Sequence, residues 1–398
     1  MKKVFVNGYG SIGSRIIQFI KDDPEIELVG VGKYSPDSKV TDAINRGFKV
    51  YVPEKNQNAF SDFTITGNIE AALDESDLVI DASPGGVGFK NKKLFYEPRD
   101  ILSIYQGGET IDGENAVSDL LFNSKVNYAD AIGKKHVMQG SCNVTGMGRI
   151  LEPLRKNFGN SIKRFDVTLV RRWADIEQTD ESVTDTIELT PSPHHGEDVK
   201  SYFGKESPLF VRAIKVPTRQ MHLHIMDIRF KDTAPSVDKI HDIFKNEYGV
   251  ATLWNAKGTK DIRDFAEKLN FGFKDTNMIH IHANMTQKID DTIQIMYSDD
   301  QTGIVIPENH MLLQAMLFEK SHEDAVKHTE KLFNMSEKKR LLESNFSKNN
   351  YFIFSILILS GLFFETFSII ILNDSISILS PSFGMSRNFS CSSPFNRE

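Results

Sequence analysis

The sequence predicts an α/β fold in which an N-terminal dinucleotide-binding domain precedes an α+β catalytic domain on a mostly antiparallel sheet. Two observations carry this prediction. A glycine-rich turn stands between a short strand and a helix at the start of the chain, and after residue 158 the strand patterns become longer and alternate. We predict domains over 1–140 and 141–304, a helix in 305–335 that returns to the first domain, and a polar linker and apolar tail over 336–398.

The composition is that of a globular protein without nucleic-acid or disulfide character. Hydrophobic residues make up 40% of the 398 residues, charged residues 25%, and the net charge is −7 without a long basic run. Two cysteines cannot form a disulfide framework, and no Cys/His cluster has metal-ligand spacing, so we expect no metal site. The N-terminus lacks a signal-peptide pattern. These features predict a cytoplasmic protein that does not bind nucleic acid.

The first motif is a G-x-G-x-x-G turn. An expected strand over 3–6 leads into Gly8, Gly10 and Gly13, and a helix is expected over 14–20. In a Rossmann unit the first glycine makes the turn, the second lets the backbone approach a pyrophosphate, and the third lets the helix pack on the strand. We therefore predict that a dinucleotide binds at this helix start. The alternative is a tight turn that binds nothing.

Lys33 stands at the end of the second expected strand, over 27–32, and no acid follows before Asp37. A basic residue at this place accommodates the 2′-phosphate of NADP, whereas an acid bonds the ribose hydroxyl of NAD. The sequence therefore favours NADP, with use of both cofactors left open. The alternative is that Lys33 is a solvated surface charge.

Two sets of further elements are expected. Short strands of the first domain lie over 63–66, 78–82, 101–105 and 137–139. Longer strands of the second domain lie over 164–171, 209–216, 221–230, 278–282 and 292–297, with helices over 237–247, 260–269 and 307–320.

Cys142 is the candidate nucleophile. A β-type run over 136–140 precedes it and an apolar helical pattern over 147–158 follows it, so the thiol is expected near a helix start. Unpaired N–H groups at a helix start favour negative charge, and we predict a lowered pKa and reaction as a thiolate. The alternative is a small buried apolar residue, because free cysteines are usually buried.

Basic side chains follow where an acyl-transfer site needs them. Arg172 ends an expected strand with a second arginine beside it, and His194 and His195 form paired donors for an anion in a loop. His222 and His224 stand on one expected strand with a single residue between them, and we expect only one of them to face a given site. Taken alone, each of these residues is more typical of a surface histidine or a solvated charge.

The end of the chain differs from the rest. Residues 351–372 are almost wholly apolar, Glu365 being their one charge, and a helix of that length spans a bilayer. Three interpretations stay open: a non-native extension, a tail anchor, and a helix that covers an interface. The second cysteine, Cys391, lies beyond this segment.

Seven short motifs occur in an order that resembles a known family. They lie at 7–13, 106–109, 141–146, 171–175, 194–196, 221–224 and 307–309. Over about residues 1 to 335 the chain closely resembles the archaeal-type, phosphorylating glyceraldehyde-3-phosphate dehydrogenase family. The Ser-Cys-Asn-x-Thr-Gly and His-His-Gly pieces are specific to it, and the nucleotide fingerprint is not.

The resemblance implies oxidation of D-glyceraldehyde 3-phosphate to 1,3-bisphosphoglycerate with NADP or NAD and inorganic phosphate, in glycolysis or gluconeogenesis. By this analogy Cys142 attacks the aldehyde, His222 takes the hydroxyl proton as hydride leaves, and phosphate attacks the resulting thioester. The implied substrate positions are Ser141, Cys142, Asn143, His194 and His195. The implied cofactor positions, besides the turn glycines and Lys33, are Ser11, Ile12, Gly108, Arg172 and Gln301. A homotetramer is also implied.

The chain departs from the family at a few places. Val144 replaces a threonine, which puts one phosphate contact in doubt, and the usual His-Gln-Glu-Ser around Gln301 is Asp-Gln-Thr-Gly here. The loop between Gly108 and Cys142 is slightly expanded. Two rival interpretations stay open: another thiol dehydrogenase, such as aspartate-semialdehyde dehydrogenase, and a membrane-tethered nucleotide-binding protein.

Overall fold

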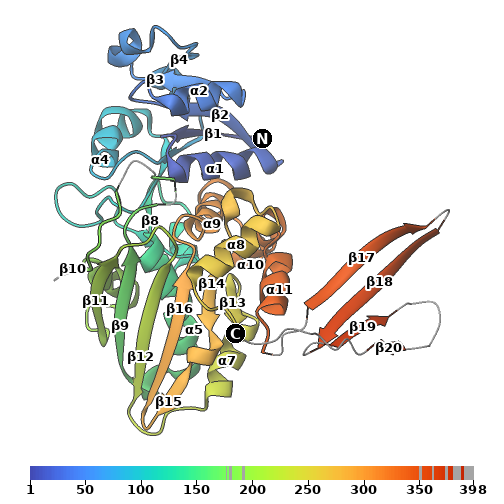
Figure 1. The fold of residues 1–398 in the computed structure, drawn as a ribbon. Coiled ribbons are helices and arrows are strands. Elements are labelled where there is room, and N and C mark those ends of the chain that lie inside the picture. Colours follow the sequence, from blue (N-terminus) through green and yellow to red (C-terminus); the bar gives the residue numbers. More distant parts are fainter. Residues whose placement is uncertain are drawn as a thin grey trace.

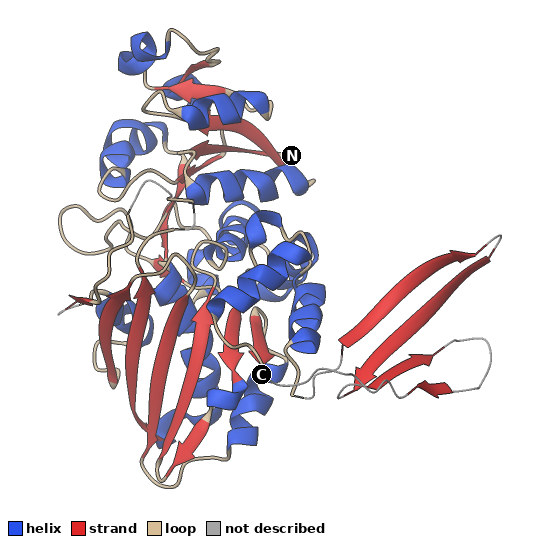
Figure 2. Ribbon diagram, viewed as in Figure 1, coloured by secondary structure: helices blue, strands red, loops and turns tan. Residues whose placement is uncertain are grey.

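The computed structural model describes residues 1–348 except 176, 179–181 and 191–192, and beyond them only the strand segments of the tail (Figure 1). Figure 2 shows two sheets with helices packed beside each, and a smaller sheet formed by the tail strands. The predicted fold class, α/β with a second, mostly antiparallel sheet, is confirmed.

The first sheet is parallel and has the strand order β4-β3-β2-β1-β5-β6-β8-β7. Its strands are β1 (Lys2–Asn7), β2 (Ile26–Gly32), β3 (Val50–Val52), β4 (Gly67–Asn68), β5 (Leu78–Asp81), β6 (Leu102–Tyr105), β7 (Leu121–Phe122) and β8 (His136–Gln139). The strand order reverses between β1 and β5, and ligands of such sheets bind outside the carboxyl ends of the strands at this point. Helices α1 (Ser11–Asp22), α2 (Ser38–Asn45), α3 (Ile69–Asp74) and α4 (Gly88–Asn91) accompany it.

One expected strand of this sheet is wrong. Residues 63–66 lie between a 3-10 helix (Glu54–Phe60) and β4, and β3 and β4 make the ladder instead. The alternating pattern has another cause, because Phe63 and Ile65 pack their side chains on the core from a loop.

The second sheet has the order β10-β11-β9-β12-β16-β14-β13, with β15 beside β16. Its strands are β9 (Ile162–Arg172), β10 (Glu188–Thr190), β11 (Leu209–Val216), β12 (His222–Phe230), β13 (Val250–Leu253), β14 (Ile279–His282), β15 (Gln287–Ile289) and β16 (Thr292–Asp299). The pairs β9–β11 and β13–β14 are parallel and the other pairs are antiparallel. Its helices are α5 (Cys142–Phe158), α6 (His195–Phe203), α7 (Val237–Lys245) and α8 (Thr259–Lys268), of which α5 packs against β9 and β16.

Three helices follow, not one helix and a linker. They are α9 (Val305–Phe318), α10 (His322–Phe333) and α11 (Met335–Asn345), and α9 packs against α1, β6 and β8. The polar stretch expected as a linker over 336–348 is mostly α11. Met335, Leu342 and Phe346 are buried on one side of it against the second core cluster. These apolar positions recur at spacings of seven and four, a helical face that the surrounding charges conceal in the sequence.

The apolar segment of the tail is not a helix. It forms β17 (Phe352–Ser360) and β18 (Phe363–Leu372), which pair antiparallel, and β19 (Ser375–Leu379) and β20 (Arg387–Phe389) extend the same sheet. Among the helices that the structure describes, none is long and apolar enough to cross a membrane. The expectation that this segment is a helix is therefore wrong. Cys391 lies outside the described residues.

Candidate active site

Cys142 is the first residue of α5, and Ser141 before it is the helix cap without a side-chain capping bond. The helix begins five residues before the apolar pattern at 147. Gly146 hides this start in the sequence, because a glycine is unfavourable in a helix interior. A Cβ at Gly146 would lie 3.0 Å from Asp299 Oδ2, so the glycine lets this helix approach β16 closely.

Asn143 joins the thiol to two histidines. Its Nδ2 lies 3.8 Å from Cys142 Sγ and 3.4 Å from His195 Nε2, and its Oδ1 lies 2.9 Å from His224 Nε2. An amide nitrogen only donates and an amide oxygen only accepts. His195 therefore accepts at Nε2 and His224 donates from Nε2. Burial lowers the pKa of both rings to about 3, so both are neutral at neutral pH.

His222 and His224 lie on the same face of β12, and the expectation that only one of them faces the site is wrong. Their rings lie 6.5 Å apart with an angle of 21° between them. Side chains two residues apart on a strand share a face. The backbone N–H of Arg172 donates to His222 Nδ1 at 3.1 Å, so the neutral ring carries its proton on Nε2. Burial and the Arg172 charge hold the pKa of His222 well below its usual range.

The predicted lowering of the Cys142 pKa is also wrong. Burial raises the pKa of the thiol to about 12; Asp299 adds to this rise and Arg172 opposes it. A charge at a helix end gains about 0.3–1 kcal/mol, which is less than one pKa unit. Full burial shifts a pKa by as much as about 3–5 units. Cys142 is half-buried by its surface exposure, and desolvation still outweighs the helix start at this thiol.

The two neighbouring histidines differ. His194 is exposed and lies near Asp198, whereas His195 is buried. Their rings stack with centroids 4.1 Å apart. His195 presents Nδ1–H as a neutral donor, so the pair offers one buried donor and one exposed ring to an anion.

Several buried polar atoms around Cys142 have no hydrogen-bond partner among the described residues. They are Ser141 Oγ, Arg171 Nε, Arg172 Nε, His195 Nδ1, His224 Nδ1 and both carboxyl oxygens of Asp299. Among the same described residues, both amide atoms of Gln301, which follows β16, are unpaired as well. Buried polar atoms are almost always paired in folded proteins. A cluster of unpaired ones indicates where a ligand supplies the partners.

Asp299 is a site residue that the sequence analysis missed. It is fully buried, pairs in register with His222, and lies 3.5 Å from His224 Nε2 through its Oδ2. Burial and the charge of Asp300 raise its pKa to about 8. The period of two along β16, whose residues 293, 295 and 297 are buried, already assigns Asp299 to the inner face.

The glycine-rich turn has the shape that a dinucleotide needs. Gly8 has φ of +131°, and a Cβ there would lie 2.5 Å from Ala82 O at the end of β5. A Cβ at Gly10 would meet none of the described atoms within 4 Å. Ser11 and Ile12 begin α1, and the Gly10 cap has no side chain to occupy their N–H groups. These free donors and this open space fit a pyrophosphate.

Two other predicted cofactor residues, Lys33 and Gly108, follow strands of the parallel sheet, whereas Arg172 ends β9 and Gln301 follows β16 in the second sheet. Lys33 follows β2 and pairs with Asp37, with 2.7 Å between Nζ and Oδ2. Gly108 follows β6, and a Cβ on Gly85 after β5 would lie 2.7 Å from Gly108 O. A Cβ on Gly107 would lie 2.7 Å from Ser141 Cα. Successive glycine turns thus bring the cofactor half into contact with the Cys142 helix.

No protein-family model matches the chain. It is 32% identical over 345 residues to a glyceraldehyde-3-phosphate dehydrogenase of Methanothermus fervidus, a match that covers 84% of this chain and 99% of that protein. It is 33% identical over 336 residues to the enzyme so named in Sulfolobus acidocaldarius, covering 82% and 95%. A third relative, from Saccharolobus solfataricus, is 31% identical over 339 residues, covering 83% and 96%.

The chain belongs to the archaeal-type glyceraldehyde-3-phosphate dehydrogenase family.

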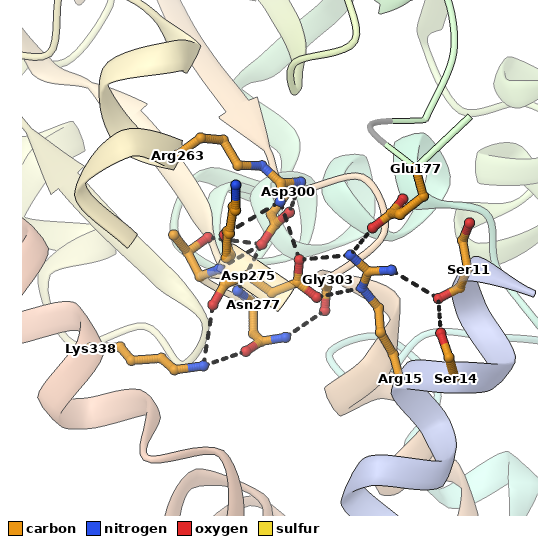
Figure 3. A network of polar contacts seen from close by, with 12 residues as sticks. Ser11, Ser14, Arg15, Glu177, Arg263, Asp275, Asn277, Asp300, Gly303 and Lys338 are labelled. Carbon is orange, nitrogen blue, oxygen red and sulfur yellow. Dashed lines mark hydrogen bonds and ion pairs between the residues drawn. The ribbon is translucent and has the colours of Figure 1, made fainter. Parts of the chain in front are cut away.

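Within this family, the Asp-Gln-Thr-Gly departure forms a connected set of contacts (Figure 3). Asp300 Oδ1 accepts from Arg263 at 2.5 Å, and its Oδ2 accepts from the backbone N–H groups of Thr276 and Asn277. A Cβ at Gly303 would collide with Asp300 Oδ2, so the glycine makes room for this carboxylate. Gln301 stays buried between them with its amide unpaired.

The same network reaches the cofactor half. Arg15 on α1, in the turn that follows the glycine motif, donates to Asp275 at 2.6 Å and to Ser11 O at 2.9 Å. Asp275 also accepts from Arg263, which connects Arg15 to Asp300 (Figure 3). The second departure, Val144, is fully buried in the apolar core. At this position the chain therefore has an apolar side chain that packs in the core, and it lacks the hydroxyl of the family's threonine.

Proposed function

We propose that this member of the family catalyses the phosphorylating oxidation of D-glyceraldehyde 3-phosphate to 1,3-bisphosphoglycerate, with NADP or NAD as the hydride acceptor. The observation that carries the proposal is the placement of Cys142 at the start of α5, with its Sγ bonded to Asn143 and ringed by unpaired buried polar atoms. Acyl transfer requires a nucleophile and, beside it, hydrogen-bond donors that stabilise the negative charge developing on the carbonyl oxygen.

The proposed chemistry passes through a thioester. Cys142 Sγ adds to the aldehyde carbon, its proton leaves to a base of the site, and the carbonyl oxygen becomes the hydroxyl of a hemithioacetal. The bound nicotinamide supplies the acceptor for the hydride from that carbon. Loss of the hydride and of the hydroxyl proton leaves an acyl thioester on Cys142. Inorganic phosphate attacks its carbonyl carbon, and the acyl phosphate leaves with the thiolate restored.

His222 has two proposed roles that require different tautomers of its ring. It first donates a hydrogen bond from Nε2 and later accepts a proton at Nε2. With Nδ1 accepting the Arg172 N–H, its Nε2–H donates to the aldehyde oxygen and polarises the carbonyl. To accept the hydroxyl proton at Nε2, the ring needs its proton on Nδ1, and the Arg172 bond must then break. The proposal therefore includes a rotation of the His222 ring away from the Arg172 N–H during each turnover.

The cofactor preference in this proposal rests on Lys33. Its side chain is mostly buried against the end of β2, whereas the paired Asp37 stays 46% exposed. A 2′-phosphate would compete with Asp37 for this ammonium group. NADP is favoured on this basis, and competition from the Asp37 carboxylate limits the strength of the preference for NADP over NAD. The homotetramer implied by the resemblance is part of the same proposal.

The test is NADPH and NADH formation by the full chain from glyceraldehyde 3-phosphate, with and without inorganic phosphate. Reduction that requires phosphate and is blocked by iodoacetate supports the proposal. Reduction at the same rate without phosphate would replace it with a hydrolysing aldehyde dehydrogenase. Reduction only with aspartate semialdehyde would favour the rival thiol dehydrogenase.

A further inference from the structure

Two histidines and an aspartate meet where the C-terminal helices pack on the end of α1, apart from the residues around Cys142. Asp23 caps the C-terminus of α1, His310 lies on α9 and His328 on α10. One ligand-type atom from each lies within 4.8 Å of those of the other two. Asp23 Oδ2 lies 2.9 Å from His310 Nε2 and 3.5 Å from His328 Nε2.

We propose that Asp23, His310 and His328 bind one Zn²⁺ ion that fastens α9 and α10 to α1. A tetrahedral zinc ion with bonds of about 2.0–2.1 Å holds its ligand atoms roughly 3.3 Å apart. The two separations from Asp23 Oδ2, 2.9 and 3.5 Å, lie on either side of that value. Two imidazoles with a carboxylate form a donor set typical of zinc.

The hydrogen bonds of His310 direct its Nε2 lone pair toward the Asp23 carboxylate. The Thr329 hydroxyl lies 2.7 Å from Ala325 O and 2.7 Å from His310 Nδ1, and it has one proton. Both contacts are hydrogen bonds only when Thr329 donates to Ala325 and His310 donates from Nδ1. The Nε2 lone pair then faces the Asp23 carboxylate at 2.9 Å. Only a proton or a metal ion makes that contact attractive.

His328 has the outer contact that is typical of a zinc-bound imidazole. Its Nδ1 lies 3.4 Å from Glu25 Oε2, and a carboxylate behind the ring orients it toward a metal on the other nitrogen. Lys320 Nζ also lies 3.2 Å from this Nδ1, and an ammonium group only donates, so this contact and an Nδ1–H bond to Glu25 exclude each other. Metal binding at Nε2 selects the ring with its proton on Nδ1, and Lys320 keeps its ion pair with Glu25. Glu25 therefore balances the charge of Lys320, and the Asp23 carboxylate stays available for the metal ion. His328 is 20% exposed, which gives the ion a way in.

Gln314 provides the fourth position and an independent reason to expect a ligand. This side chain on α9 is fully buried, and its Oε1 has no hydrogen-bond partner among the described residues. Its Nε2 lies 3.1 Å from His310 Nε2. Rotating the amide by 180° exchanges the two atoms without changing its shape. The unpaired oxygen then points at the cluster, at the spacing of a zinc ligand.

The experiment is zinc binding by the full chain, in a Cys142→Ala background so that the active-site thiol does not take up metal. After incubation with Zn²⁺ and removal of the free ion, metal content is measured by mass spectrometry and affinity by competition with a chromogenic chelator. We expect one tightly held Zn²⁺ per chain. His328→Ala should weaken the affinity by at least about 100-fold, and Glu25→Gln by about tenfold, the effect of an outer partner.

A matched control is His322→Ala, on the same helix but packed against Tyr128 instead of the cluster. It should bind zinc as the parent does. Equal zinc affinity of the parent and His328→Ala, or no zinc retained by either, would overturn the proposal. A second measurement does not depend on affinity: Zn²⁺ should raise the unfolding temperature of the parent but not of His328→Ala. The same rise in both proteins would also overturn it.

Discussion

The active site and the ion network in Figure 3 are both buried and both join distant parts of the chain, yet they treat their polar atoms differently. In the network, Asp275 pairs with Arg15 and Arg263, and Asp300 pairs with Arg263 and two backbone N–H groups. Around Cys142, donors and acceptors of several residues stay unpaired. Each unpaired buried polar group costs about 1–3 kcal/mol. Paired charges therefore serve the fold, and unpaired ones mark where substrate and cofactor complete the structure.

The largest expected effect is a loss of catalytic activity when the nucleophile of the active site is removed. Cys142→Ala should lower kcat/KM by at least about 10⁴-fold, because it removes the nucleophile. Cofactor affinity should stay close to that of the parent, since the glycine turn is untouched. Steady-state kinetics and a fluorescence titration with NADPH check both. Cys391→Ala is the control and should keep full activity; substantial turnover by Cys142→Ala would assign the chemistry elsewhere.

The next largest expected effect is a loss of stability when a charge of the ion network is removed. Arg263→Met should lower the free energy of unfolding by about 3–5 kcal/mol, because it leaves the buried Asp300 carboxylate without its cation, while Asp275 keeps Arg15. Arg155→Met is the control, since Arg155 is 55% exposed in its pair with Glu152 and should cost at most about 1 kcal/mol. Urea unfolding of both variants measures the difference. Equal costs would mean that the network contributes no more than a surface pair.

In the active site, the stability contributed by Asp299 should depend on pH. Its pKa is raised to about 8 in the folded protein, above about 3.9 for an unfolded aspartate. Between these values the unfolded state binds fewer protons, so this group makes the folded state less stable as pH rises. Asp299→Asn should therefore gain stability relative to the parent from about pH 4 to about pH 8. Urea midpoints at pH 5 and pH 8 test this, and a constant difference would contradict the raised pKa.

The smallest effect concerns the Lys33–Asp37 pair. Lys33→Asp should lower the ratio of kcat/KM for NADP to that for NAD by about tenfold or more, because a carboxylate repels the 2′-phosphate. Asp37→Asn should raise the ratio by at most about fivefold, the range of a partly exposed pair. Initial rates with both cofactors measure the ratios. Unchanged ratios in both variants would remove Lys33 from the cofactor site.

Much of the fold is readable from local sequence patterns. The strand–glycine turn–helix of β1 and α1 and the alternating strands β9, β11, β12 and β16 lie where the sequence predicts them, to within a few residues. The elements that were missed have weak local patterns. In α11 charged residues surround a narrow apolar face, and β3 and β4 are too short to show a period.

The candidate site was less predictable, because its properties depend on contacts between distant residues. The identities of Cys142 and Asn143 are plain in the sequence, but the Asn143–His224 bond joins residues 81 positions apart. The thiol pKa depends on burial, which the helix start alone does not indicate. The proposed zinc ligands are more distant still, Asp23 and His310 being 287 positions apart, so no spacing motif shows them.

The most direct test of the account is to trap the acyl group. The full chain is incubated with glyceraldehyde 3-phosphate and NADP without inorganic phosphate, quenched in acid, digested and examined by mass spectrometry. The account predicts a 3-phosphoglyceroyl thioester on the peptide that contains Cys142, which disappears when phosphate is added before the quench. An acyl group on another peptide, or cofactor reduction without any acyl-enzyme, would contradict it.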